Sequence, residues 1–73
     1  MMHYSTLIQQ LKARRESLQV TQETLAMSSG VSLRALKLFE SGKGNPTLET
    51  LSKWGAALGL EVQFQVKNLH IEP

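Results

Sequence analysis

The sequence predicts a mainly α-helical domain of four to five helices that is followed by a single β-strand. Three observations support this fold class. Apolar residues recur at helical spacing along most of the chain, residues suited to helix caps flank these stretches, and apolar and polar residues alternate only near the C-terminus. We therefore expect a helical domain over residues 1–59, a strand over residues 60–67 and a flexible tail over residues 68–73.

Length and composition limit the classes to which the protein can belong. The chain has 73 residues and no cysteine, so it forms neither a disulfide nor a cysteine-rich metal site. A domain of this size is marginally stable unless it is strongly helical or dimeric. No apolar run reaches the length of about 18 residues that a membrane span requires, and the N-terminus lacks the pattern of a signal peptide. We expect a cytoplasmic protein.

The chemistry-bearing side chains do not form a catalytic or metal-binding pattern. The chain contains no aspartate, and its glycines do not form a phosphate-binding loop. His3 and His70 lie near opposite ends of the chain, a separation that gives no metal-ligand spacing. We expect no enzymatic activity, no bound metal and no cofactor.

The first helix is expected over residues 5–17. Ser5 is suited to the N-cap. One apolar stripe of this segment consists of Leu7, Ile8 and Leu11. Val20 should be buried just before the second helix, as in a hydrophobic staple.

The second helix is expected over residues 22–28, with Thr21 as its N-cap. Gly30 should end it, because glycine adopts the left-handed conformation that residues with a Cβ atom resist. Leu25 and Ala26 are the inward pair. The small side chain of Ala26 allows another helix to approach closely.

The third helix should begin after Ser32 and end near Gly42. Leu36 and Phe39 are three residues apart and should face the core together with Val31. Two short helices joined by a tight turn are typical of a helix-turn-helix, in which the second helix enters the major groove of DNA.

The fourth helix should begin after Thr47 and end at Gly59. Trp54 is the largest apolar side chain available for burial. The spacings of three and four residues predict an inward face made of Leu48, Leu51, Gly55 and Leu58.

The hydrophobic period changes after the fourth helix. Four apolar residues alternate there with polar ones and predict a strand of about seven residues: Leu60, Val62, Phe64 and Val66. A single strand leaves backbone donors and acceptors unpaired. Two alternatives follow. The strand pairs with the same strand of a second copy in a C2 homodimer, or it packs flat on its own helices.

Several linked motifs resemble the Xre/Cro-type helix-turn-helix family over residues 5–59. They are TQE (21–23), LA (25–26), GVS (30–32), FESGK (39–43), NPTLETL (45–51) and ALG (57–59). The following strand is similar to the HipB branch, the antitoxin partner of HipA-type kinase toxins. The resemblance implies a lambda-repressor-like bundle whose strands pair across a homodimer. It also implies binding to a palindromic operator in double-stranded DNA, repression of its own operon, and binding to a HipA-type toxin.

The resemblance also assigns roles to residues. Gln22 matches a position that donates to a DNA phosphate in the family. Lys43 follows the recognition helix, the second helix of the helix-turn-helix, at a position where the family commonly contacts a phosphate. Thr21 either contacts a phosphate or acts only as a cap. The exposed face that should read bases consists of Ser32, Leu33, Arg34, Lys37 and Leu38.

The chemistry of these side chains refines their roles. Arg34 carries the planar fork that matches guanine O6 and N7, and Lys37 can reach a base or a phosphate. Leu33 and Leu38 depart from the family, which more often has polar residues there, so they either touch thymine methyl groups or pack against a partner. Glu40 is interpreted as structural, and an ion pair with Arg15 is one option.

The sequence leaves the biological role of the protein open. The leading hypothesis is a sequence-specific repressor that is also the antitoxin of a toxin operon. The alternatives are a phage-type regulator without a toxin, and a protein-interaction module whose main role is to hold a toxin.

Overall fold

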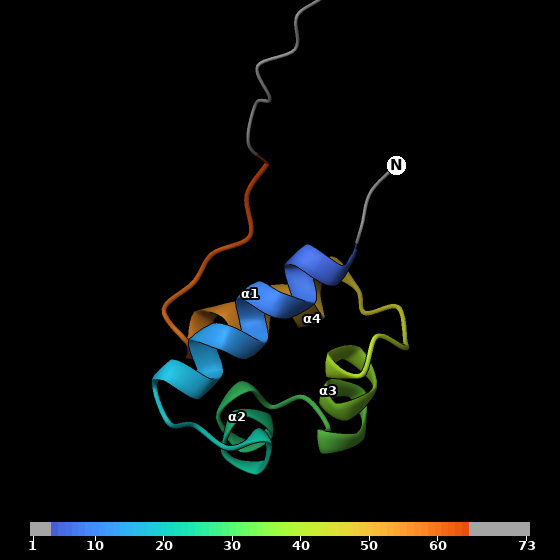
Figure 1. The fold of residues 1–73 in the computed structure, drawn as a ribbon. Helices are drawn as coiled ribbons and strands as arrows, with labels where there is room; N and C mark the ends of the chain where they lie inside the picture. The colour runs from blue at the N-terminus through green and yellow to red at the C-terminus, as the bar shows by residue number, and fades with distance from the viewer. Residues whose placement is uncertain (1–3, 65–73) are drawn as a thin grey trace, which may run out of the picture.

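The computed structural model describes residues 4–64, which form four helices. They are α1 (Tyr4–Ser17), α2 (Gln22–Ser29), α3 (Leu33–Glu40) and α4 (Leu48–Ala57). In Figure 1, α1 lies in front of α4, and α2 and α3 lie below them, joined by a short turn. The mainly helical class is confirmed, as is the helix-turn-helix order of α2 and α3.

Hydroxyl side chains begin three of the four helices, as the sequence predicts. Thr21, Ser32 and Thr47 have extended backbones, and each accepts a hydrogen bond from the backbone N–H three residues later, at 3.0, 3.2 and 3.1 Å. Each cap of this kind contributes about 1 kcal/mol to stability. The prediction for Ser5 was wrong, because α1 already includes Tyr4 and Ser5 therefore lies inside the first turn.

Left-handed residues end the helices. Gly30 caps α2 with φ 75° and donates its N–H to the carbonyl of Ala26. Ser41 rather than Gly42 is the C-cap of α3, and Gly42 follows it with φ 86°. The end of α1 has the same geometry without a glycine, since Gln19 has φ 58° there.

The core is formed by all four helices. Trp54 of α4 is completely buried, and its ring lies 5.2 Å from that of Phe39 at a tilt of 32°. Tilted aromatic pairs contribute about 0.5–1.5 kcal/mol beyond the area that they bury. The buried apolar residues are Leu11, Leu25, Leu36, Phe39, Trp54 and Leu58. All six come from stretches whose apolar spacing predicts an inward face.

The inward face of α4 is shorter than predicted. Leu51 packs against the core, and Gly55 and Leu58 are buried, but Leu48 is 62% exposed. Leu48 is the first residue of α4, and its side chain lies largely at the surface. The prediction for Leu48 was therefore wrong, although it shares the helical stripe.

The predicted strand is not present in the described residues that follow α4. Residues 60–64 form no regular secondary structure, and Val66 lies outside the described residues. A strand requires a partner for its backbone hydrogen bonds, and no described segment of the single chain supplies one. The strand over residues 60–67 is thus not confirmed, and Phe64 is 97% exposed.

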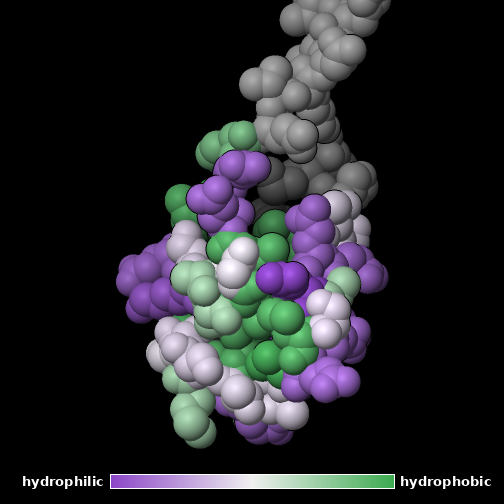
Figure 2. All heavy atoms as spheres, turned by 90° about the vertical axis from the view of Figure 1, so that its left-hand side faces the viewer, coloured by the Kyte–Doolittle hydropathy of each residue, from purple (hydrophilic) through white to green (hydrophobic). Residues whose placement is uncertain are grey.

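Apolar residues reach the surface on one side of the domain. Figure 2 shows the face on which α1 and α4 end, where apolar residues gather in the middle and hydrophilic residues surround them. Small domains cannot cover all their apolar surface.

Candidate nucleic-acid interface

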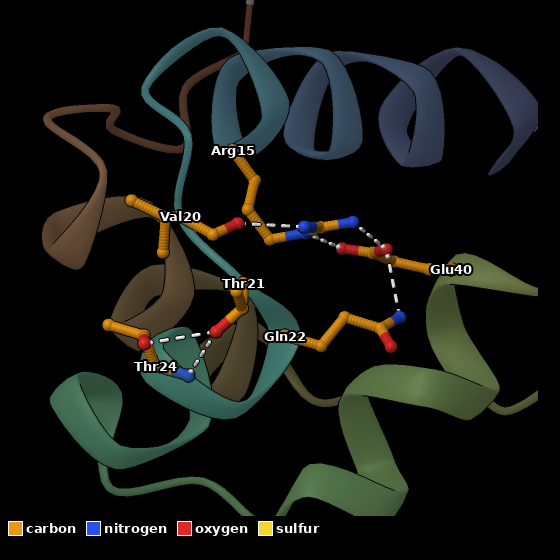
Figure 3. A network of polar contacts seen from close by, with 6 residues as sticks. All are labelled: Arg15, Val20, Thr21, Gln22, Thr24 and Glu40. Carbon is orange, nitrogen blue, oxygen red and sulfur yellow. Dashed lines mark hydrogen bonds and ion pairs between the residues drawn. The ribbon is translucent and has the colours of Figure 1, made fainter.

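A buried polar network joins three segments of the domain (Figure 3). The Arg15 guanidinium donates to both carboxylate oxygens of Glu40, Nε to Oε2 and Nη2 to Oε1, each at 2.8 Å. Its Nη1 donates to the carbonyl of Val20, also at 2.8 Å. Gln22 donates from Nε2 to Oε1 of Glu40 at 3.1 Å. The ion pair that the sequence offered as one option for Glu40 is therefore present.

The network fixes α3 against α1 and against the start of α2. The side chains of Arg15 and Glu40 are only 10% and 4% exposed. Hydrogen bonding to Glu40 raises the pKa of Arg15, although desolvation by burial acts in the opposite direction. A buried pair is stable only when further hydrogen bonds satisfy it, and Val20 and Gln22 supply them. The charge of Glu40 is thereby directed inward.

The outer face of α3 carries an open hollow of about 520 Å³. Its residues share one side of the helix, because Lys37 and Leu38 lie three and four residues after Arg34, and Ser41 lies three residues after Leu38. The complete lining is Leu33, Arg34, Lys37, Leu38, Ser41 and Lys43. The structure therefore brings together five of the residues that the sequence assigns to DNA contacts.

The loop after α3 is tied to the carbonyl of Leu38. That oxygen accepts hydrogen bonds from the Lys43 N–H and from the Ser41 hydroxyl, both at 2.8 Å. A Cβ atom added at Gly44 would lie 3.4 Å from Cβ of Leu38, so the loop passes close to this side chain. These contacts place Lys43 beside the C-terminal end of α3.

The other candidate residues lie outside the hollow. Thr21 and Ser32 are exposed caps at the starts of α2 and α3. Gln22 is half-buried and engaged by Glu40. Of the residues assigned to dimerisation, Leu60 and Val62 line a separate groove of about 490 Å³ beside α1 and α4.

Sequence reasoning did not assign Ser41 to the site. Its position seven residues after Arg34 places it on the same helical face, and this spacing could have identified it. Arg15 was proposed only as one option for Glu40, because a charged residue on an amphipathic helix is usually solvated. Its burial depends on the position of α3, which local periodicity does not give.

The described residues offer no other type of site. Among residues 4–64, no group of three or more histidine, aspartate or glutamate side chains is arranged to hold a metal ion. None of the four described helices is both long enough and apolar enough to cross a membrane.

Sequence comparison identifies known proteins that are similar to this chain. The chain is 37% identical over 54 residues to the cryptic phage CTXphi transcriptional repressor RstR of Vibrio cholerae serotype O1. The aligned part covers 74% of this chain and 48% of that repressor, so the chain spans about half the length of its relative. The HipB-like branch is not confirmed. The helix-turn-helix family matches residues 11–65, which is well over half of the chain, and the protein therefore belongs to the Xre-type helix-turn-helix family.

Proposed function

We propose that the protein is a sequence-specific DNA-binding transcriptional repressor. The observation that carries this proposal is the charge of the outer face of α3. Arg34, Lys37 and Lys43 surround its hollow, whereas Glu40, the acidic residue of α3, is turned inward by Arg15. A cationic helix face of this kind suits the phosphates and acceptor edges of the major groove.

The side chains divide into base-reading and positioning groups. Arg34 would read guanine through a bidentate contact, and Lys37 would reach a base or a phosphate one turn later. Leu33, Leu38 and Ser32 complete the base-reading face. Thr21, Gln22 and Lys43 would contact phosphates and fix the register of the helix.

A homodimer on a palindromic operator is the second part of the proposal. The alternation of apolar residues over 60–66 supports pairing of this segment with a second copy, which would satisfy its backbone groups. Leu60, Val62 and Phe64 are 36%, 41% and 97% exposed, so they are available for such pairing. A C2 dimer would place its recognition helices in half-sites whose centres lie about 34–36 Å apart.

The biological context has two candidates. The similarity of the C-terminal segment to the HipB branch supports an antitoxin that represses its own operon and binds a HipA-type toxin. The similarity to a phage repressor supports a regulator without a toxin. Co-expression with the product of the adjacent gene distinguishes them, because an antitoxin should co-purify with that product at a fixed stoichiometry. A module that held such a product but bound no DNA would have protein interaction as its main role.

The test of DNA binding is selection of duplexes from a random pool by the full chain. Fluorescence anisotropy would then compare selected with scrambled duplexes across a range of salt concentrations. We expect a palindromic consensus and a logarithmic salt dependence whose slope corresponds to several neutralised phosphates. Equal affinity for selected and scrambled duplexes would contradict sequence-specific repression.

A further inference from the structure

We propose that the hollow on α3 selects thymine, and that the 5-methyl group of this base rests on Leu38 and Leu33. This inference rests on the proposed function, because it names the base that the recognition helix prefers. The starting observation is that Leu38 is 39% exposed, whereas its helix neighbours Leu36 and Phe39 are buried. An apolar side chain on a reading face gains from burial only if its target carries an apolar group.

The position of Leu38 is fixed before any ligand arrives. Its carbonyl accepts hydrogen bonds from Ser41 and Lys43, and the backbone at Gly44 approaches its Cβ atom. The side chain of Leu38 therefore projects from a helix end that is held by hydrogen bonds to the following loop. Leu33, one and a half turns earlier, is half-buried and lines the same hollow.

The charges around the hollow distinguish DNA from a protein partner. Arg34, Lys37 and Lys43 surround the two leucines, and no acidic residue lines the hollow. An apolar protein segment would leave these three cations unpaired. A base pair in the major groove is flanked by phosphates, which would pair with them.

Among the bases, thymine alone fits this combination. It presents a methyl group beside the O4 acceptor in the major groove, whereas cytosine presents an amino donor. An amino group facing Leu38 would lose its water without gaining a hydrogen-bond partner. Arg34, four residues before Leu38 on the same helical face, would then contact the adjacent base pair, where guanine offers two acceptors.

The test replaces individual thymines by deoxyuridine, which lacks only the 5-methyl group. After the full chain has selected its preferred duplex, each thymine of a half-site is replaced in turn and the affinity is measured. Burial of one methyl group corresponds to about a four-fold change in affinity per half-site. We expect such a loss at one thymine in each half-site for the wild type, and no loss at that position for Leu38→Ala.

Two variants serve as controls. Leu38→Met keeps an apolar side chain of similar volume and should retain the sensitivity to uracil. Met27→Ala changes an apolar residue that is 84% exposed and does not line the hollow, so this variant should also retain the sensitivity to uracil. Fluorescence of Trp54, the single tryptophan, reports whether each variant is folded.

The outcomes separate this inference from the function on which it rests. Specific binding in which every uracil substitution is neutral would overturn thymine selection and leave repression intact. Sensitivity that persists in Leu38→Ala would overturn the assignment of Leu38. Loss of a co-purifying protein from Leu38→Ala, with unchanged response to uracil, would show that the hollow docks a protein instead. Absence of any duplex selection would overturn the inference together with the proposed function.

Discussion

Arg15 on α1 holds Glu40 on α3 through two hydrogen bonds of 2.8 Å, and both side chains are almost completely buried. The pair has two effects on the domain. It fixes the C-terminal end of α3 to α1, and it removes the negative charge of α3 from the face that carries Arg34 and Lys37. The stability of the domain and the charge of the outer face of α3 thus depend on the same contact.

Arg15→Ala should destabilise the domain by about 3 kcal/mol or more, because it leaves the buried carboxylate of Glu40 without its cation. Urea unfolding followed by Trp54 fluorescence measures this effect. The pKa of Arg15 is raised in the folded state, so the contribution is complete below its ordinary value and is lost only as pH rises through the higher folded value. The loss of stability in Arg15→Ala can therefore be measured at any pH in the neutral range.

Lys53→Ala is the matched control for Arg15→Ala. Lys53 pairs with Glu49 at 3.3 Å on the exposed side of α4, where the two side chains are 50% and 76% exposed. Exposed pairs of this kind contribute about 0.5 kcal/mol or less. Equal unfolding midpoints for the two variants would contradict a structural role for the buried pair.

The helices and their caps could be predicted from the sequence because local chemistry determines them. Thr21, Ser32 and Thr47 act within their own helices, and Gly30 acts within its own turn. The core residues followed from spacing alone. Leu48 is the exception, since it shares the helical stripe but is 62% exposed.

The site was less predictable than the fold. Arg34, Lys37 and Lys43 could be selected by charge and motif, and the structure places them around one hollow. The contact of Gln22 with Glu40 could not be predicted, because it joins residues 18 positions apart in sequence on different helices. Strand pairing at 60–66 would require a second chain. The sequence of one chain points to that partner only through the alternation of apolar and polar residues.

Gln19→Gly should stabilise the domain by about 1 kcal/mol. Gln19 has φ 58°, a conformation that costs a residue with a Cβ atom about 1–2 kcal/mol, and glycine adopts it without this cost. The gain is reduced by the greater freedom of glycine in the unfolded chain. Thermal unfolding measures the difference, and a lower midpoint for Gln19→Gly would contradict the interpretation.

Gly30→Ala adds a Cβ atom at a left-handed position, whereas Gln19→Gly removes one. Gly30 has φ 75°, and a Cβ atom built on it meets no other atom within 4 Å. Any loss must therefore arise from backbone strain rather than from a clash. We expect destabilisation of about 1 kcal/mol, and an unchanged midpoint would show that the turn relaxes.

Thr21→Ala separates capping from phosphate contact. Loss of its hydrogen bond with the Thr24 N–H should destabilise the domain by about 1 kcal/mol, and Thr47→Ala should do the same at the start of α4. If Thr21 also contacts a phosphate, Thr21→Ala should weaken duplex binding more than Thr47→Ala at a temperature where both are folded. Equal affinities would leave Thr21 with the capping role alone.

Arg34→Ala should weaken binding to the selected operator by about 1–3 kcal/mol and relax the preference at one base pair. Lys43→Ala should instead weaken all duplexes to a similar extent and lower the salt slope by about one. Competition between the selected operator and single-base variants measures both effects. A uniform loss for Arg34→Ala would make it a phosphate contact and contradict its assignment to base reading.

Lysine substitutions at Val62 and Phe64 should disrupt the proposed homodimer, because they place charge on the apolar side of the alternating segment. Gln63→Lys is the matched control, since a strand would direct this residue to the opposite side. Substitution is preferable to truncation after Gly59, because the Leu60 N–H donates to the Gly55 carbonyl at 2.7 Å and closes the end of α4. Sedimentation equilibrium should give monomers for Val62→Lys and Phe64→Lys and a dimer for Gln63→Lys. If all three variants dimerised as tightly as the wild type, the copies would associate through another surface.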